Sequence, residues 1–244
     1  NQHLKFDHLF KDIQALGGTH LATGHYVAVI RDEATGAYEM RKAKDERKDQ
    51  SYFLYTIPRN ILPFVVFPLG SLTKGEVREQ ARLLDLPVAQ KKESQDICFI
   101  PEQKYHSFLA GRGVKPEAGN IVNLKGRVLG RHPGTCFYTI GQREGLGVSS
   151  AGRLYVTAID LIKNEVVLGP REALLSRGLR AERVNLLKEP LPSEATVRIR
   201  YGQRGVPAHI RFEGKRLEVI FDEPKESVTP GQSVVVARTG AHST

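Results

Sequence analysis

The residue with the greatest chemical potential in this sequence is Cys98, within the stretch "ESQDICFIP". A reactive thiol must be deprotonated, and an unperturbed cysteine, with a pKa of about 8.5, is mostly protonated at neutral pH. Lys91 and Lys92 would lower that pKa, whereas Asp96 and an apolar pocket would raise it. Cys98 ends a polar loop, which favours reactivity, but free cysteines are often core residues. From these residues alone we slightly favour a structural role.

The second cysteine, Cys136, lies in the alternating run "TCFYTIG", and we predict that it is a structural strand residue. Two cysteines are too few for a disulfide framework or a zinc site, and the eight histidines lack metal-ligand spacing. We therefore expect no metal site formed by protein side chains. The low cysteine content indicates a reducing, cytoplasmic location.

Two stretches in the first quarter of the chain carry groups that suit ligand binding. In "ATGHYV", Gly24 and His25 follow a predicted strand, and ligands gather at strand ends in open α/β sheets. A plain turn with a surface histidine explains this hexamer equally simply, and alone we favour it. In "KDQSYFLY", Lys48, Asp49 and Gln50 precede aromatic residues, a combination that suits phosphate and base contacts. A solvated loop before a buried strand is an equal alternative.

Three later stretches add polar candidates. "YTIGQREGLG" holds Gln, Arg and Glu between glycines and predicts either a binding loop or a long hairpin loop, but not a Walker loop. In "RIRYGQRG", strand alternation would place Arg198 and Arg200 on one face, with Tyr201 beside them. Gln232 follows a Pro-Gly turn in "TPGQSVVV".

The charge balance favours a polyanionic partner. Lys and Arg number 36 against 27 Asp and Glu, which gives a net charge of +9. Nucleic acid and an unspecialised basic surface are about equally compatible with this excess. No apolar run approaches the roughly 20 residues that cross a membrane, so we expect no membrane partner.

The elements that must position these residues fall into three parts. Residues 1–103 alternate helical and strand patterns, including a helix at "TKGEVREQARLLDL" with a capping box from Thr73 and Glu76. This alternation predicts about half of a doubly wound parallel-sheet domain. Residues 104–170 show short strands with a hairpin turn at "KNE", and residues 171–244 continue with a Glu-Gly-Lys turn, which predicts a small β-barrel.

Taken together, these motifs resemble the bacterial-type tRNA-specific 2-thiouridylases. "ATGHYV", "KDQSYFLY", "FPLGSLTKGEVREQA", "KKESQDICFIP", "YTIGQREGLG", "RIRYGQRG" and "VTPGQSVVV" follow in that family's order over nearly the whole chain. The resemblance implies an α/β plus β fold. Its parts would be the C-terminal half of a Rossmann-like ATP-pyrophosphatase domain (1–103), a small central domain (104–170) and a C-terminal β-barrel that binds tRNA (171–244).

The resemblance also implies an activity, namely ATP-dependent 2-thiolation of the wobble uridine in the tRNAs for Lys, Glu and Gln. ATP, with Mg²⁺, would adenylate the C2 oxygen, and a persulfide on Cys98 would deliver sulfur supplied by a sulfur-relay protein or cysteine desulfurase. Gly24 matches a backbone contact to ATP. The implied contacts to tRNA are His25, Lys48, Asp49, Gln50, Arg200, Tyr201 and Gln232.

The sequence departs from the family pattern at its start. The loop Ser-Gly-Gly-x-Asp-Ser, which would cradle the ATP phosphates, does not occur, and the family's first, nucleophilic cysteine would lie immediately before Asn1. We therefore expect an N-terminally truncated chain that is inactive alone. The alternatives are a non-catalytic tRNA-binding module and another adenylating ATP-pyrophosphatase enzyme with a structural Cys98.

Overall fold

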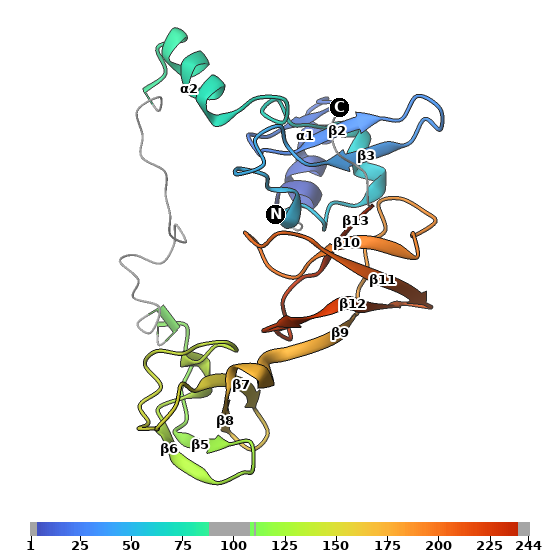
Figure 1. Cartoon of the computed structure of the whole chain (residues 1–244). Coiled ribbons are helices and arrows are strands. Elements are labelled where there is room, and N and C mark those ends of the chain that lie inside the picture. Colours follow the sequence, from blue (N-terminus) through green and yellow to red (C-terminus); the bar gives the residue numbers. More distant parts are fainter. Residues whose placement is uncertain (1–3, 88–107, 110, 239–244) are drawn as a thin grey trace. The chain divides into compact units, whose positions relative to one another are not determined.

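The computed structural model describes residues 4–87, 108–109 and 111–238, which belong to two compact units (Figure 1). The first unit combines 1–91, 180–220 and 233–244, and the second combines 92–179 and 221–232. The chain therefore leaves the first unit, forms most of the second, and returns. Segments from the two ends of the sequence consequently meet within the first unit.

The first unit begins with an N-terminal helix, which comprises the π-helical turn η1 (Leu4–Leu9) and α1 (Phe10–Ala15). Phe6 and Phe10, four residues apart, are both buried, as expected for one face of a helix. The helix is followed by Gly17, which adopts a left-handed φ of +82°. Its apolar face packs into a core that includes Leu21, Val27, Leu54, Ile57, Leu62, Val65 and Phe67.

A short parallel pair of strands lies against this helix in the same core. β1 (Leu21–Ala22) pairs with β4 (Val65–Val66), and the helical turns η2 (Ser51–Phe53) and η3 (Arg59–Phe64) precede β4. Parallel pairing is the signature of an α/β domain, because parallel strands need a crossover connection. The pair agrees with the predicted part of a doubly wound sheet.

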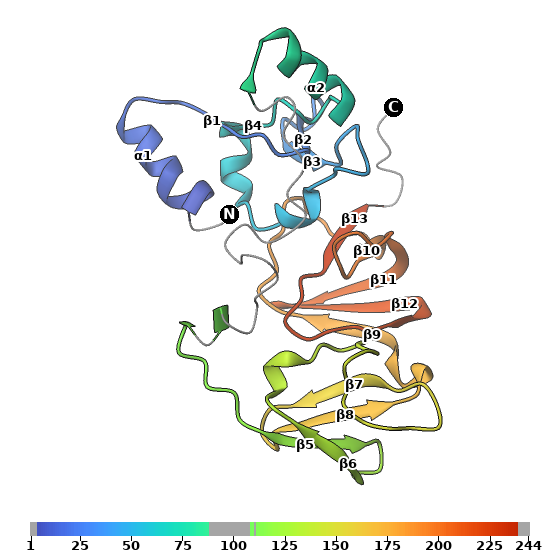
Figure 2. The ribbon, with the colours of Figure 1, turned by 90° about the vertical axis from the view of Figure 1, so that its left-hand side faces the viewer.

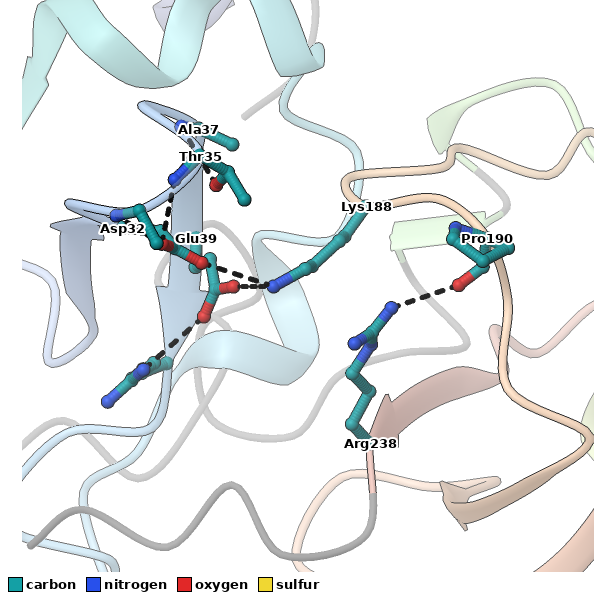
Figure 3. Close-up of polar contacts among 9 residues, drawn as sticks. Asp32, Thr35, Ala37, Glu39, Lys188, Pro190 and Arg238 are labelled. Carbon is teal, nitrogen blue, oxygen red and sulfur yellow. Dashed lines mark hydrogen bonds and ion pairs between the residues drawn. The ribbon is translucent and has the colours of Figure 1, made fainter.

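A β-hairpin follows β1 in the first unit. β2 (Ala28–Arg31) and β3 (Tyr38–Arg41) form an antiparallel hairpin whose turn is held by Asp32. Figure 3 shows Lys188, from the segment 180–220 of the same unit, contacting both Asp32 and Glu39 of this hairpin. Lys188 lowers the pKa of Glu39 through a hydrogen bond, so Glu39 is ionised at neutral pH and the ion pair is maintained. The returning segment is thus tied to the N-terminal one.

Helix α2 (Lys74–Leu83) carries the predicted capping box. The Thr73 hydroxyl accepts from the Glu76 amide at 3.2 Å, and the Glu76 carboxylate accepts from the Thr73 amide at 2.6 Å. Lys44 adds an ion pair to Glu76 at 2.7 Å. The Lys44 contact, followed by the Thr73 hydrogen bonds, lowers the pKa of Glu76 from 4.5 to about 2.

We expect the contribution of Glu76 to stability to depend on pH. Because the folded pKa lies below the ordinary value, the stabilisation is present above pH 4.5 and is lost as the pH falls toward about 2. Glu76→Gln keeps a cap acceptor and removes the charge. Thermal unfolding of both proteins between pH 7 and pH 3 should show a difference in melting temperature that shrinks with acidity. Glu46→Gln controls for the loss of one exposed charge, and a constant difference would contradict the assignment.

The C-terminal strands form an antiparallel sheet of five strands within the described residues, in the order β13-β10-β11-β12-β9 (Figure 2). β13, β10 and β11 lie wholly in the first unit, whereas β12 and β9 contribute residues to both units. Alternate residues such as Ala195, Val197, Leu217 and Val219 are buried, which explains the period-two pattern of the sequence. The bounds are β9 Leu175–Ala181, β10 Glu194–Arg198, β11 Val206–Glu213, β12 Arg216–Glu226 and β13 Val235–Arg238.

The second unit contains a sheet in the order β6-β5-β8-β7, with a core built from Ile121, Val156, Val166 and Leu168. The predicted turn at "KNE" is confirmed, since it joins β7 to β8 in an antiparallel pair. The bounds are β5 Gly119–Asn123, β6 Val128–His132, η6 Thr135–Phe137, β7 Tyr155–Asp160, β8 Glu165–Gly169 and η7 Arg171–Leu174.

One prediction in this unit is wrong. Cys136 lies in the 3-10 turn η6 rather than in a strand, and its half-buried thiol is free. Because Thr135–Phe137 form a 3-10 turn, the alternating pattern of "TCFYTIG" is not realised as a strand there. In the described residues the sheets are open at their ends rather than closed into barrels. None of the described helices has the length and apolar character needed to span a bilayer.

Candidate functional site

Asp49 is the centre of a buried polar cluster in the first unit. Its side chain is 3% exposed, and Arg198, at the end of β10, donates to it from Nη1 at 2.9 Å. The Asp49 carboxylate also accepts from the Ser51 hydroxyl at 2.7 Å and from the Ala43 amide at 3.2 Å. A second nitrogen of Arg198 donates to the Ser51 hydroxyl at 2.6 Å. A buried carboxylate needs such partners, and here one of them comes from 149 residues further along the chain.

Gln50 connects this cluster to the predicted turn around Gly24 and His25. The side-chain oxygen of Gln50 accepts a hydrogen bond from the backbone amide of Tyr26 at 2.9 Å. The backbone amide of Gln50 donates to the Tyr26 carbonyl at 2.8 Å. The side chain of Gln50 therefore acts like one more backbone partner for this turn. The two predicted stretches "ATGHYV" and "KDQSYFLY" are consequently held together.

Tyr52 brings in a third segment, next to Gln232. Its hydroxyl donates to the Ser233 carbonyl at 2.8 Å, and the Ser233 hydroxyl donates to Tyr55 at 2.7 Å. Burial, with a smaller contribution from Tyr55, raises the pKa of Tyr52 above its ordinary value of 10.0. The hydroxyl is thus protonated at neutral pH and can act as the donor. Gln232, the residue before Ser233 in the sequence, is exposed.

An exposed pair of aromatic rings, Phe53 and Tyr201, lies beside the buried cluster. The ring centroids are 4.3 Å apart, with an interplanar angle of 39°. Phe53 is 42% exposed and Tyr201 is 51% exposed, although both have apolar ring faces. Tyr52 contacts Phe53 edge-on at 5.7 Å and supports the pair from the buried side. Exposed rings held in this way can stack against an unpaired nucleic-acid base.

Basic residues lie close in the sequence to both rings. Lys48 and Arg200 are half-buried, and Arg204 is exposed in the loop between β10 and β11. Arg198 pairs with Asp49. The prediction that Arg198 and Arg200 share one strand face is wrong, since β10 ends at Arg198 and Arg200 lies in the loop. The arrangement can hold phosphates around a stacking surface.

Gly24 and His25 lie where β1 ends. A Cβ on Gly24 would meet only Leu69 Cδ1, at 3.7 Å, and the residue is exposed, so its backbone is open to a ligand. His25 Nδ1 lies 2.9 Å from the Thr23 hydroxyl. Burial, followed by repulsion from Lys5, lowers the pKa of His25 below 6.5, so the ring is neutral at pH 7. His25 can therefore hydrogen-bond at that pH but carries little charge.

The structure thus places five predicted residues in the first unit, namely Lys48, Asp49, Gln50, Arg200 and Tyr201, whereas Gln232 belongs to the second unit. Gly24 and His25 are linked to them through Tyr26. Cys98 lies outside the described residues. Sequence reasoning missed Ser51 and Ser233, whose roles depend on partners far away in the chain. Over the described ranges, no group of three or more His, Cys, Asp or Glu could hold a metal ion.

Family models of known proteins match most of the chain. Three family models match consecutive parts: "tRNA methyl transferase HUP domain" at residues 1–102, "tRNA methyl transferase PRC-barrel domain" at 106–170, and "Aminomethyltransferase beta-barrel domain" at 176–238. HUP domains are Rossmann-like, which agrees with the parallel pairing of β1 and β4.

Curated relatives match over almost the whole chain. "tRNA-specific 2-thiouridylase MnmA 1" of Syntrophus aciditrophicus is 48% identical over 97% of this chain and 63% of its own length. The 2-thiouridylase MnmA of Geotalea uraniireducens is 46% identical over 96% of the chain and 64% of its own length. That of Carboxydothermus hydrogenoformans is 42% identical over 98% of the chain and 67% of its own length. The chain thus spans slightly less than two thirds of the first two relatives.

Proposed function

This chain belongs to the family of tRNA-specific 2-thiouridylases, and on that premise we propose that the protein carrying it converts a uridine of tRNA to 2-thiouridine. The descriptions of the matching family models refer to methyl transferases. The relatives that match nearly the whole chain are instead named as 2-thiouridylases. We follow the relatives, because their similarity extends across all three parts. The target of the proposed reaction is the wobble uridine of the tRNAs for Lys, Glu and Gln.

One observation supports the tRNA-binding part of the proposal most strongly. Three segments that are far apart in the sequence, around residues 48–53, 198–201 and Ser233, meet in one cluster of the first unit. The buried ion pair of Asp49 and Arg198 lies on the inner side of this cluster, and the exposed rings of Phe53 and Tyr201 lie on its outer side. Rings for bases and cations for phosphates are the two requirements of single-stranded RNA recognition.

The proposed chemistry uses ATP as co-substrate. ATP would transfer its adenylate to the C2 oxygen of uracil and release pyrophosphate, which makes that oxygen part of a leaving group, AMP. The terminal sulfur of a persulfide on Cys98 would then attack C2, and the C2–O bond would break to release AMP. The thiolate of a second cysteine would attack the Cys98 sulfur, so that the persulfide S–S bond breaks, a disulfide forms between the two cysteines, and the transferred sulfur stays on C2. Sulfur would come from a donor protein. The open backbone at Gly24, at the end of a parallel strand, fits a contact to the nucleotide.

We propose that each tRNA contact has a distinct role. Lys48 and Arg200 would bind phosphates, and Gln232 would hydrogen-bond through its exposed amide. His25, neutral at pH 7, would donate or accept a hydrogen bond. Asp49 and Gln50 already use their side-chain oxygens within the protein, so we assign them to positioning the segment rather than to direct contact through those oxygens.

Replacing Phe53 by alanine should weaken tRNA binding by about 5- to 150-fold, since stacking contributes about 1–3 kcal/mol per base. Tyr201→Ala should have a similar effect, whereas Tyr201→Phe, which keeps the ring, should retain most of the affinity. The measurement is a filter-binding titration of the chain with tRNA.

Phe212→Ala serves as the matched control, because Phe212 lies in the same unit and is 39% exposed. It should bind tRNA like the wild-type chain. Equal losses for Phe53→Ala and Phe212→Ala would show that the rings do not form a stacking site and would count against the proposed function.

A further inference from the structure

A second group of basic residues lies in the second unit, and it includes none of the residues assigned above to tRNA. A hollow of about 400 Å³ is lined by three arginines, Arg143, Arg153 and Arg171, together with Tyr155, Glu226 and Ser227. Arg143 belongs to "GQREGLG", a stretch predicted to form either a binding loop or a long hairpin loop, and the proposed reaction gives it no role. Backbone hydrogen bonds hold part of the lining of the hollow, and its three arginine side chains are exposed to solvent.

The loop that carries Arg143 is held in shape by its neighbour Gln142. The side-chain oxygen of Gln142 accepts from the Thr139 amide at 3.0 Å, and its side-chain nitrogen donates to the Glu144 carbonyl at 2.9 Å. The backbone of the loop is further bonded to Val156 of β7 in both directions, at 2.8 and 2.9 Å. Arg143 is therefore presented by a preorganised turn, which lowers the entropic cost of binding a ligand.

A glycine lets this loop approach the opposite wall. Gly141 has a φ of +90°, and a Cβ there would lie only 2.6 Å from the Ser227 hydroxyl oxygen. Both the backbone conformation and the available space require glycine at this position. The close contact fixes the distance between the Arg143 loop and the segment that follows β12.

The charge of the hollow is positive. Two of its arginines have carboxylate partners: Arg171 pairs with Glu226 at 2.8 Å, and Arg143 pairs with Glu144 at 2.8 Å. These pairs are exposed and weak, so a stronger anionic ligand can replace the carboxylates. Within the part of the chain that the structure describes, Arg153 has no carboxylate partner. Three guanidinium groups against the carboxylates of Glu226 and Glu144 leave a surplus of one positive charge, on Arg153.

We propose that this hollow binds a backbone phosphate of the tRNA, with Arg153 as the principal contact and Arg143 and Arg171 beside it; this inference rests on the proposed function. A guanidinium group matches the geometry of phosphate oxygens with two parallel hydrogen bonds. The lining offers cations and hydroxyl groups but only one aliphatic side chain, the buried Leu174, so it lacks the apolar anchor typical of a protein partner. Such a contact positions the RNA without reading its sequence.

The test is the salt dependence of tRNA binding by the chain and its variant Arg153→Ala. Removing one phosphate contact should lower the affinity about five- to eightfold at about 0.1 M salt and reduce the slope of log K against log [salt] by about 1. Arg153→Glu should cause a larger loss. Because Arg153 is exposed, neither change should unfold the chain. Arg127→Ala, at an exposed arginine between β5 and β6, should leave the affinity and slope unchanged.

The possible outcomes separate the two proposals. If the wild-type chain binds tRNA, Phe53→Ala weakens binding and Arg153→Ala does not, the second site is refuted and the proposed function stands. If the wild-type chain does not bind tRNA, both fail. A calorimetric titration with inorganic phosphate alone identifies a free-anion site, and a titration with a poly-glutamate peptide identifies an acidic protein partner. Tight binding of either one, lost in Arg153→Ala while tRNA binding is unchanged, would also overturn the inference.

Discussion

Asp49→Ala is expected to destabilise the first unit by about 3–5 kcal/mol, because it leaves the largely buried guanidinium of Arg198 without its counter-ion. The same change removes the acceptor of the Ser51 hydroxyl and of the Ala43 amide. The segment that holds Phe53 would then lose its anchor, so tRNA binding should weaken together with stability. Urea denaturation gives the first quantity, and tRNA titration gives the second.

Two controls separate this explanation from a simple loss of charge. Glu182→Ala breaks an exposed ion pair with Arg216 and should cost at most about 1 kcal/mol. The double variant Asp49→Ala/Arg198→Met leaves no unpaired buried charge and should recover much of the stability lost in Asp49→Ala. If Asp49→Ala is no less stable than Glu182→Ala, the buried ion pair does not organise the cluster.

The second large effect concerns Cys98. In the protein that carries this chain, Cys98→Ser should reduce 2-thiouridine formation at least about a thousandfold, because serine cannot form a persulfide and loss of a reacting group has effects of that size. Binding of tRNA should be unchanged, since the residues assigned to binding are intact. The product is measured by mass spectrometry of nucleosides from the reacted tRNA.

Cys136→Ser is the matched control, because Cys136 lies in the turn η6 of the second unit, outside every site proposed here. It should thiolate tRNA like the wild-type protein. Unchanged thiolation by Cys98→Ser would mean that Cys98 is structural, as its apolar neighbours alone suggested. The sulfur carrier would then have to be another residue.

Local features of the fold could be predicted from the sequence because their causes are local. The capping box of Thr73 and Glu76 depends on two residues three positions apart, and the structure confirms both of its hydrogen bonds. The hairpin turns at "KNE" and Glu-Gly-Lys follow from turn residues between alternating strands. The prediction that Cys136 lies in a strand is wrong because the chain forms the 3-10 turn η6 there, which the alternating sequence pattern does not indicate.

The cluster itself could not be derived from local patterns. Asp49 and Arg198 are 149 residues apart, and Tyr52 and Ser233 are 181 residues apart. Strand periodicity placed Arg198 beside Arg200, but the strand ends at Arg198, which turns inward to Asp49. The family resemblance indicated which residues matter. The structure adds that Asp49 and Gln50 use their side-chain oxygens internally, whereas Phe53 and Tyr201 expose their rings.

The central claim, that the protein carrying this chain thiolates tRNA, is tested most directly by its product. Unmodified tRNAs for Lys, Glu and Gln are incubated with the protein, ATP and a persulfide donor, and their nucleosides are then quantified. We predict 2-thiouridine at the wobble position, formed only when ATP is present, with one AMP released per thiolated base. The account would be contradicted by an absence of 2-thiouridine while the protein binds tRNA, or by 2-thiouridine formed equally without ATP.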